Sequence, residues 1–225
     1  MKMLALVAAS LGLVACSDDT PGGVDAPVDA AVDAPFTDYQ LTGEYVDWDS
    51  TTSDFLGIVG ATWTVVDEPG RTATTAPNGR VILTAPPRVA TITVTRTGYL
   101  DARFVADPAV FAAPGTGFSA RGITPERAES FYQSLGLPAF DPEAAHVLVE
   151  TVGADVPLTL TGATVAFVSD GVDDTTWVAG DTGFFVLFPN VPVGSGTGTL
   201  GSTEAFTGPT SLPLEAGRLT ITTIR

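Results

Sequence analysis

Apolar and polar residues alternate with a period of two along much of the chain after Tyr39, a pattern typical of β-strands. In the segment 89–95, Ala90, Ile92 and Val94 alternate with three threonines, which predicts a strand with one buried and one solvated face. The C-terminal segment 217–225 has the same alternation and is expected to close the chain as a similar strand. Short runs rich in Thr, Val, Gly and Pro fill most of the remainder. The fold class predicted is therefore all-β.

A pattern of strand, turn and strand occurs twice. The first copy has Gly-Ala-Thr-Trp-Thr-Val at positions 60–65 and Asn78-Gly79 after it. The second has Gly-Ala-Thr-Val-Ala-Phe at positions 162–167 and Gly183 after it. Because Asn-Gly favours the positive backbone angles of a tight turn, each copy is predicted to form a hairpin between two strands.

The order of these features resembles the carboxypeptidase regulatory-like family, which folds as a transthyretin-like β-sandwich. The first copy has the Gly-Ala strand, the Asn-Gly turn, an apolar strand and the late pair Gly98-Tyr99 of that family. The second copy has no Gly-Tyr pair and contains a glycine-rich run at positions 194–198 instead. The resemblance implies two Ig-like or transthyretin-like sandwich units with a non-catalytic accessory role.

One short helix is expected between the copies. Thr124 is suited to cap its N-terminus, Pro125 to its first position, and Gly136 to its C-terminal end. The expected organisation comprises a signal peptide (1–15), a tether (16–37), a first sandwich unit (38–106), a connecting segment with the helix (107–142) and a second sandwich unit (143–225). Whether the copies are separate domains or halves of one sandwich is left open.

The N-terminus has the pattern of a lipoprotein signal. A positive residue, Lys2, precedes an apolar run that is too short to span a bilayer. The sequence Leu-Val-Ala-Cys then ends at Cys16 and resembles the lipobox of bacterial lipoproteins. The resemblance implies that Cys16 is acylated and anchors the protein to a membrane. An Asp directly after the cysteine would resemble an inner-membrane retention signal, but this chain has Ser17 there. The outer membrane is therefore expected, on either its periplasmic or its surface side.

The next segment is predicted to be an extended tether. It repeats a Val-Asp-Ala unit and contains Pro27 and Pro35, which disfavour a helix. At roughly 3.1 Å per residue, about 20 extended residues reach on the order of 60 Å. The segment is either a spacer or a low-complexity tail without a selected length.

Charge and rare residues exclude several functions. The chain has 10 Lys+Arg against 26 Asp+Glu, a formal net charge of -16, so nucleic acid is not an expected partner. One cysteine and one histidine cannot form a site that needs two of either residue. His146 heads an apolar run and is expected to be structural. No catalytic residues are assigned, and the protein is not expected to be an enzyme.

Two groups of residues are candidates for ligand binding. Acidic residues crowd one loop, where they suit either weak calcium binding or a solvated surface: Asp170, Asp173, Asp174 and Asp181. No other cofactor is expected. Trp177 lies in a polar segment and is the candidate for stacking on a sugar, whereas Trp63 shares strand parity with apolar residues and is expected in the core. A second acidic segment surrounds Trp48.

These observations favour a lipid-anchored cell-envelope protein with a non-catalytic binding or structural role. The alternatives are a carbohydrate-binding module and an envelope hydrolase that uses loop carboxylates. The membrane, through Cys16, is one expected partner, and a glycan or another envelope protein is a second. The identity of the ligand and the oligomeric state are left open.

The anchor can be tested by replacing Cys16 with serine. Because Cys16 is the only thiol, C16S should abolish incorporation of labelled fatty acid and release the protein from the membrane fraction. Unchanged labelling and membrane partition would contradict the lipoprotein interpretation.

Overall fold

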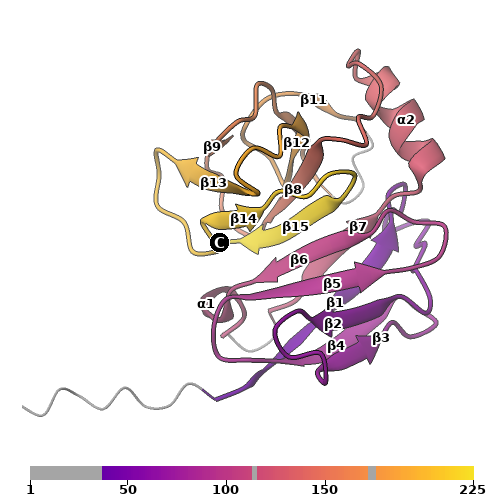
Figure 1. Cartoon of the computed structure of the whole chain (residues 1–225), viewed down its shortest axis with the longest axis vertical. Coiled ribbons are helices and arrows are strands. Elements are labelled where there is room, and N and C mark those ends of the chain that lie inside the picture. Colours follow the sequence, from indigo (N-terminus) through magenta and orange to yellow (C-terminus); the bar gives the residue numbers. More distant parts are fainter. Residues whose placement is uncertain (1–36, 113–115, 172–175) are drawn as a thin grey trace, which may run out of the picture. The chain divides into compact units, whose positions relative to one another are not determined.

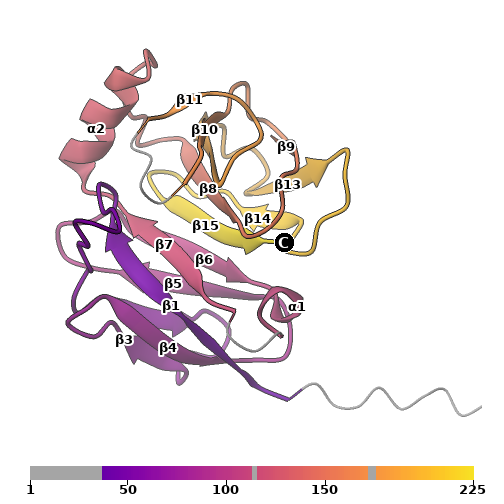
Figure 2. The ribbon, with the colours of Figure 1, turned by 180° about the vertical axis from the view of Figure 1, so that it is seen from behind.

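The structure is a computed structural model that describes residues 37–112, 116–171 and 176–225 (Figures 1 and 2). Strands dominate these residues, which confirms the all-β prediction. The largest sheet has nine strands in the order β11-β10-β12-β8-β15-β6-β5-β2-β3. Their bounds are β2 (Thr62–Val65), β3 (Thr72–Thr74), β5 (Ala90–Thr95), β6 (Ala102–Ala106), β8 (Ala145–Thr151), β10 (Phe167–Ser169), β11 (Val178–Ala179), β12 (Phe185–Val191) and β15 (Leu219–Ile224).

Two smaller sheets of three strands accompany the large one. The first has the order β4-β1-β7, with β1 (Tyr39–Asp47), β4 (Arg80–Ala85) and β7 (Phe118–Gly122). The second has the order β14-β13-β9, with β9 (Leu158–Leu160), β13 (Thr197–Ser202) and β14 (Ser211–Pro213).

The C-terminal strand β15 joins the two halves of the chain. It pairs in parallel with β6 from the first predicted unit and with β8 from the second. The structure therefore does not confirm two separate sandwich units, because strands from both ranges share one hydrogen-bonded sheet and residues 36–225 group as one compact unit. The non-local pairing partners of β15 could not be identified from the local alternation of residues.

The nine-stranded sheet has a hydrophobic core on each face. On β8, Leu148 packs into one core, while Val147 and Val149 pack into the other. The first core is shared with the β4-β1-β7 sheet through residues such as Leu41 and Leu83. The second is shared with the β14-β13-β9 sheet, chiefly through Leu158, Leu160, Leu200 and Leu212. The middle of the large sheet is therefore covered on both sides.

This covering explains why one of the two predicted strands has a solvated face and the other does not. β5 has the predicted alternation, with Ile92 and Val94 buried and its threonines partly exposed. β15 forms as predicted but is buried on both faces, so the expected solvated face is wrong. Its threonines satisfy their hydroxyls internally, because Thr220 donates to the Pro213 carbonyl (2.6 Å) and Thr222 to the Val105 carbonyl (2.9 Å).

The first copy departs from the predicted hairpin, whereas the second keeps the predicted strand pairing. Gly79 has the expected positive φ of 74°, but the strands around the Asn78-Gly79 turn are not a hairpin: β3 pairs with β2, whereas β4 pairs with β1 in another sheet. The turn therefore carries the chain between sheets. In the second copy Gly162 lies in a turn with φ of 89° and the strand begins only at Phe167. This strand, β10, pairs antiparallel with β12 after Gly183, so the predicted pairing of the two strands is confirmed.

The predicted helix is α2 (Pro125–Ser134). Thr124 caps it by accepting a hydrogen bond from the Arg127 N–H, and Gly136 follows with φ of 72°. A one-turn helix, α1 (Pro108–Phe111), was not expected. Neither of these helices, the only two in the described residues, has the length and apolarity of a membrane span.

Gly79 offers a test of the inter-sheet turn. A Cβ at this position would lie 2.6 Å from the Tyr45 carbonyl oxygen, and the positive φ would add strain. Gly79→Val should lower the free energy of unfolding by about 1–3 kcal/mol in a denaturant titration. Gly70→Val is the control, because no atom lies within 4 Å of a Cβ there. Equal stability of the two variants would contradict this geometry.

Candidate functional site

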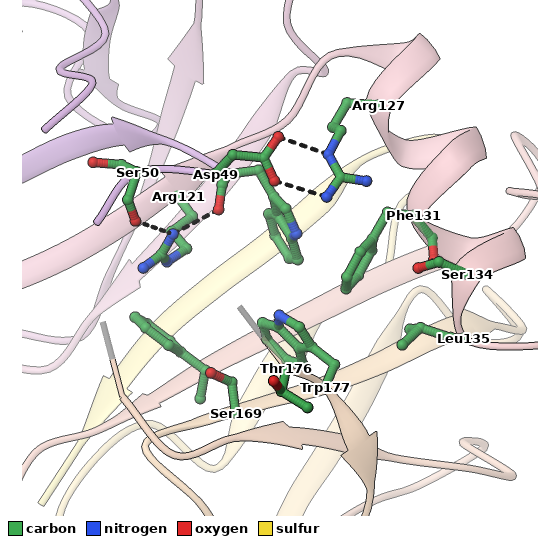
Figure 3. A pocket seen from close by; sticks show the side chains of 12 residues that line it. Asp49, Ser50, Arg121, Arg127, Phe131, Ser134, Leu135, Ser169, Thr176 and Trp177 are labelled. Carbon is green, nitrogen blue, oxygen red and sulfur yellow. Dashed lines mark hydrogen bonds and ion pairs between the residues drawn. The ribbon is translucent and has the colours of Figure 1, made fainter. Parts of the chain in front are cut away.

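A pocket of about 330 Å³ opens beside α2 (Figure 3). Its walls come from the turn after β1, from β7, α2, β10 and β12, and from the residues before β11. The lining residues are Trp48, Asp49, Ser50, Arg121, Arg127, Phe131, Ser134, Leu135, Ser169, Thr176, Trp177 and Phe185. The sheet and the helix thus bring together residues from distant parts of the sequence.

Three aromatic side chains form one wall of the pocket. The rings of Trp48 and Trp177 stack with centroids 5.6 Å apart and an interplanar angle of 17°. The Phe131 ring meets both edge-on, at 5.1 Å from Trp48 and 5.5 Å from Trp177. Trp48 and Phe131 are buried, whereas Trp177 is half-buried. Because two buried rings fix its position, Trp177 presents a pre-organised aromatic surface to the pocket.

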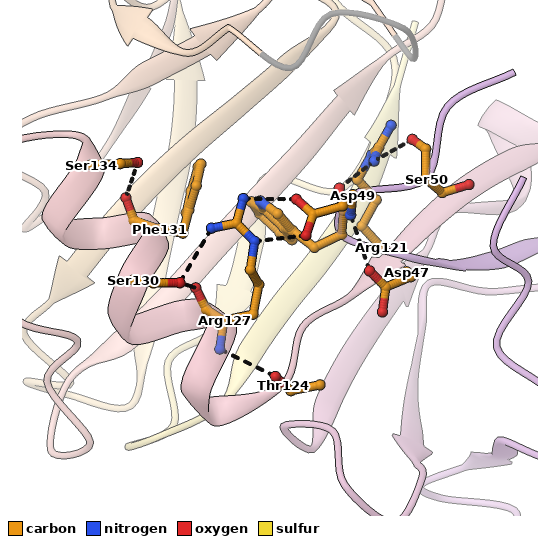
Figure 4. Close-up of polar contacts among 10 residues, drawn as sticks. Asp47, Asp49, Ser50, Arg121, Thr124, Arg127, Ser130, Phe131 and Ser134 are labelled. Atoms are coloured by element: carbon orange, nitrogen blue, oxygen red, sulfur yellow. Dashed lines mark hydrogen bonds and ion pairs between the residues drawn. The ribbon is translucent and has the colours of Figure 1, made fainter. Parts of the chain in front are cut away.

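A charged pair stands at the rim of this wall (Figure 4). The Arg127 guanidinium donates from two nitrogens to the two carboxylate oxygens of Asp49, both at 2.7 Å. Arg127 is in the first turn of α2, which the Thr124 cap fixes, and its guanidinium lies 5.3 Å from the centroid of the Phe131 ring. The side chains keep 35% and 47% of their surface exposed, so their remaining donors and acceptors can reach a ligand.

Arg121 of β7 organises the floor. It is 5% exposed, and its Nη1 donates to the carbonyls of Trp48 (2.6 Å) and Ser50 (3.0 Å). Its guanidinium also lies over the Phe185 ring at 4.9 Å. These contacts hold the turn after β1 against the large sheet and so help to set the position of Trp48.

The candidate binding residues selected from the sequence have different locations in the structure. Trp177 lines the pocket, and Trp63 is fully buried in the core as predicted. Cys16 and two of the four calcium candidates, Asp173 and Asp174, lie outside the described residues. Asp170 and Asp181 are described, but within the described part of the chain no three metal-ligating side chains converge. Calcium binding by this loop stays a prediction.

The stacking of Trp48 on Trp177 was missed by sequence reasoning. The sequence marks Trp48 as one of three tryptophans able to stack on a sugar, but it does not pair Trp48 with Trp177 or bring Arg127 close to them. No local pattern links these residues, because their contact depends on how α2 and the large sheet pack. One signal is available in the sequence: Arg127 stands four residues before Phe131 in the predicted helix, a spacing that puts both on one helix face.

His146 has the structural role expected of it. It is 1% exposed, its Nδ1 lies 2.7 Å from the Tyr132 hydroxyl, and its ring stacks on Phe140 with centroids 4.1 Å apart. Burial lowers the pKa of the imidazole to about 4. The neutral ring therefore ties β8 to the helix rather than serving the pocket.

Glu150 of β8 is a buried carboxylate that interacts electrostatically with Arg121. It is 4% exposed and accepts hydrogen bonds from the Ser119 N–H (3.1 Å) and the Thr223 hydroxyl (2.9 Å). Burial raises the pKa of this carboxyl to about 7, although the hydrogen bonds and the charges of Arg121 and Arg225 oppose the rise. Glu150 thereby connects the edge of β7 to the large sheet.

Comparison with known proteins identifies no family. No family model and no curated protein matches the sequence. Among solved structures, the Bacillus anthracis TIE protein is similar at 11% identity and a TM-score of 0.23, over 83% of this chain and 33% of that chain. A streptococcal ancillary pilin is similar at 13% identity and a TM-score of 0.25, over 85% of this chain and 62% of that chain. The chain thus spans less than two thirds of either protein, and likenesses this weak carry no argument about its function.

The raised pKa of Glu150 predicts a pH-dependent stability. The unfolded carboxyl ionises near its ordinary pKa of 4.5, whereas the folded one ionises near 7. The contribution of Glu150 to stability should therefore be complete below pH 4.5 and decline until about pH 7, by on the order of 1–3 kcal/mol. This decline should be absent in Glu150→Gln. The test measures the difference between the unfolding free energies of variant and wild type across pH 4–8.

The lowered pKa of His146 makes stability rise with pH in both wild type and variant. This shared slope cancels when the two unfolding free energies are subtracted. Glu204→Gln, at an exposed carboxylate, is the control and should leave the profile unchanged. A difference curve for Glu150→Gln that is flat from pH 4 to 8 would contradict the raised pKa.

Proposed function

We propose that this protein is a non-catalytic carbohydrate-binding module, held at the outer membrane by acylated Cys16, and that its pocket beside α2 binds a saccharide. The observation that carries the proposal is the pre-organised Trp177 ring beside the Arg127–Asp49 pair in a pocket of about 330 Å³. The anchor rests on the resemblance of the sequence before Cys16 to a lipobox.

The chemistry of a sugar ring matches both parts of this site. Its C–H faces are apolar and pack against an aromatic ring, while its hydroxyls donate and accept hydrogen bonds. Trp177 offers the aromatic ring, Asp49 offers acceptor oxygens and Arg127 offers donor nitrogens. The Asp49–Arg127 pair can therefore bind neighbouring hydroxyls of one sugar.

The size of the pocket limits the ligand. Its volume of about 330 Å³ is at the lower end of the range of roughly 300–1,000 Å³ that is usual for small-molecule sites. The site therefore suits one or two sugar units, either free or at the end of a longer glycan.

A binding role is favoured over hydrolysis by the acids available. Glycoside hydrolysis commonly needs two carboxyl groups on either side of the scissile bond. Among the described residues that line the pocket, Asp49 is the sole carboxylate, and it is engaged with Arg127. A screen for glycosidase activity would test the hydrolase alternative directly.

Truncation of Trp177 tests the binding site. A glycan array probed with the unlipidated chain, residues 17–225, should identify ligands, whose affinity is then measured by calorimetry. Trp177→Ala should weaken binding at least about tenfold, because the stacking surface is lost, and Trp177→Phe should retain part of it. Phe55→Ala is a matched control, because Phe55 is an aromatic residue, 45% exposed, that does not line this pocket.

Two outcomes would contradict the proposal. One is the absence of any glycan ligand on the array. The other is a ligand whose affinity is reduced equally by the Trp177 and Phe55 substitutions.

A further inference from the structure

One open face of the nine-stranded sheet is covered with threonines. The strands β3, β2 and β5 lie side by side at one end of this sheet, and their alternate positions are all threonine. The residues are Thr62 and Thr64 on β2, Thr72 and Thr74 on β3, and Thr91, Thr93 and Thr95 on β5. We define these seven residues as the threonine face.

The strand register aligns the threonines in rows across the sheet. Thr62 pairs with Thr74 on one side and with Thr95 on the other. Thr64 likewise pairs with Thr72 and Thr93 in a second row. Strand geometry spaces the rows about 6.8 Å apart and the side chains within a row about 4.8 Å apart. The result is a two-dimensional array rather than a scatter of polar residues.

The array is held in place by the core behind it. The residues between the threonines, Trp63, Ile92 and Val94, are fully buried on the opposite face. Threonine is β-branched and has few χ1 rotamers, so a fixed backbone also restricts its hydroxyl and methyl groups. Two of the hydroxyls, on Thr64 and Thr72, lie 3.3 Å apart.

Methyl groups extend the face at one end, and none of its seven residues carries a charge. Val66 and Val89 follow the same alternation at the ends of β2 and β5, with 48% and 49% of their surface exposed. The Val66 N–H donates to the Thr91 carbonyl, which continues the ladder beyond β2. At the border with β6, Arg103 is bound to Glu215 and donates to the Thr93 hydroxyl. Arg96 and Asp101 line a hollow at the opposite end, beside Thr62 and Thr95. Charge is therefore confined to the borders of the face, in a chain with a formal net charge of -16.

Such a face suits a ligand that is itself regular in two dimensions. A small molecule needs a concave site that surrounds it, and an acidic or basic partner needs opposite charge. In the prism face of hexagonal ice, water molecules repeat along two perpendicular directions at spacings close to those of the threonine array. Threonine side chains attached at these backbone spacings can order a layer of water that joins the crystal. We propose that the threonine face binds ice.

The size of the array predicts a modest effect. Neighbouring strands rotate by roughly 20–25° relative to one another, so a match to a flat crystal face degrades beyond a few strands. The three strands of the threonine face therefore favour adsorption to ice and slower recrystallisation over a large depression of the freezing point. The pocket beside α2 is not part of this face, so the proposal stands apart from carbohydrate binding.

The test uses the unlipidated chain, residues 17–225, and ice itself as the probe. The protein should partition into a slowly growing ice hemisphere and keep ice grains small during annealing, while serum albumin at equal concentration should do neither. Thr64→Tyr places a bulky ring in the centre of the array and should abolish both effects. Thr74→Tyr, on the edge strand β3, should also abolish them and is the second variant if Thr64→Tyr lowers the melting temperature.

Thr84→Tyr is the matched control, because Thr84 is an exposed strand threonine on β4, in another sheet. This variant should keep the wild-type activity. The proposal is overturned if the wild type is excluded from ice as albumin is, if both array variants remain active while folded, or if Thr84→Tyr is as inactive as they are.

Discussion

The pairing of β15 between β6 and β8 is the interaction on which the rest of this structure depends. The strand is parallel to both neighbours and buried on both faces, so the last residues of the chain complete the centre of the sheet. One face contributes Leu219 and Ile221 to the first core. On the other, the hydroxyls of Thr220 and Thr222 are satisfied by carbonyls, which removes the cost of burying them. Without this strand, β6 and β8 would each lose a pairing partner, and the two halves of the sheet would not be joined.

Both candidate surfaces derive from this continuous sheet. The pocket lies beside its β12 and β10 strands, where α2 and the turn after β1 bring Trp48 and Arg127 to Trp177. The threonine face lies at the other end, on β5, β2 and β3, where the described structure places no small sheet over it. The same sheet can thus support a concave aromatic site and an exposed threonine face, because only part of its surface is needed to form the two cores.

Local sequence patterns predicted the individual strands and the helix better than they predicted which strands pair with one another. Alternation predicted β5 and β15, capping residues predicted α2, and Asn78-Gly79 predicted a turn with positive φ. The hairpin at that turn and the two separate units were not found, because pairing across sheets depends on contacts distant in sequence. In the site, Trp177 could be selected as a candidate from its polar surroundings, whereas its partners could not. Cys16 and the calcium loop remain predictions.

Native-state hydrogen exchange tests most directly whether both halves of the chain form one sheet. If β15 joins them, the amides of β5 and β6 and those of β8 and β12 should open together, with one free energy that falls equally in denaturant. The amides of β15 should share that value. Two distinct opening free energies, one for β5 and β6 and another for β8 and β12, would contradict the account and restore two independent units.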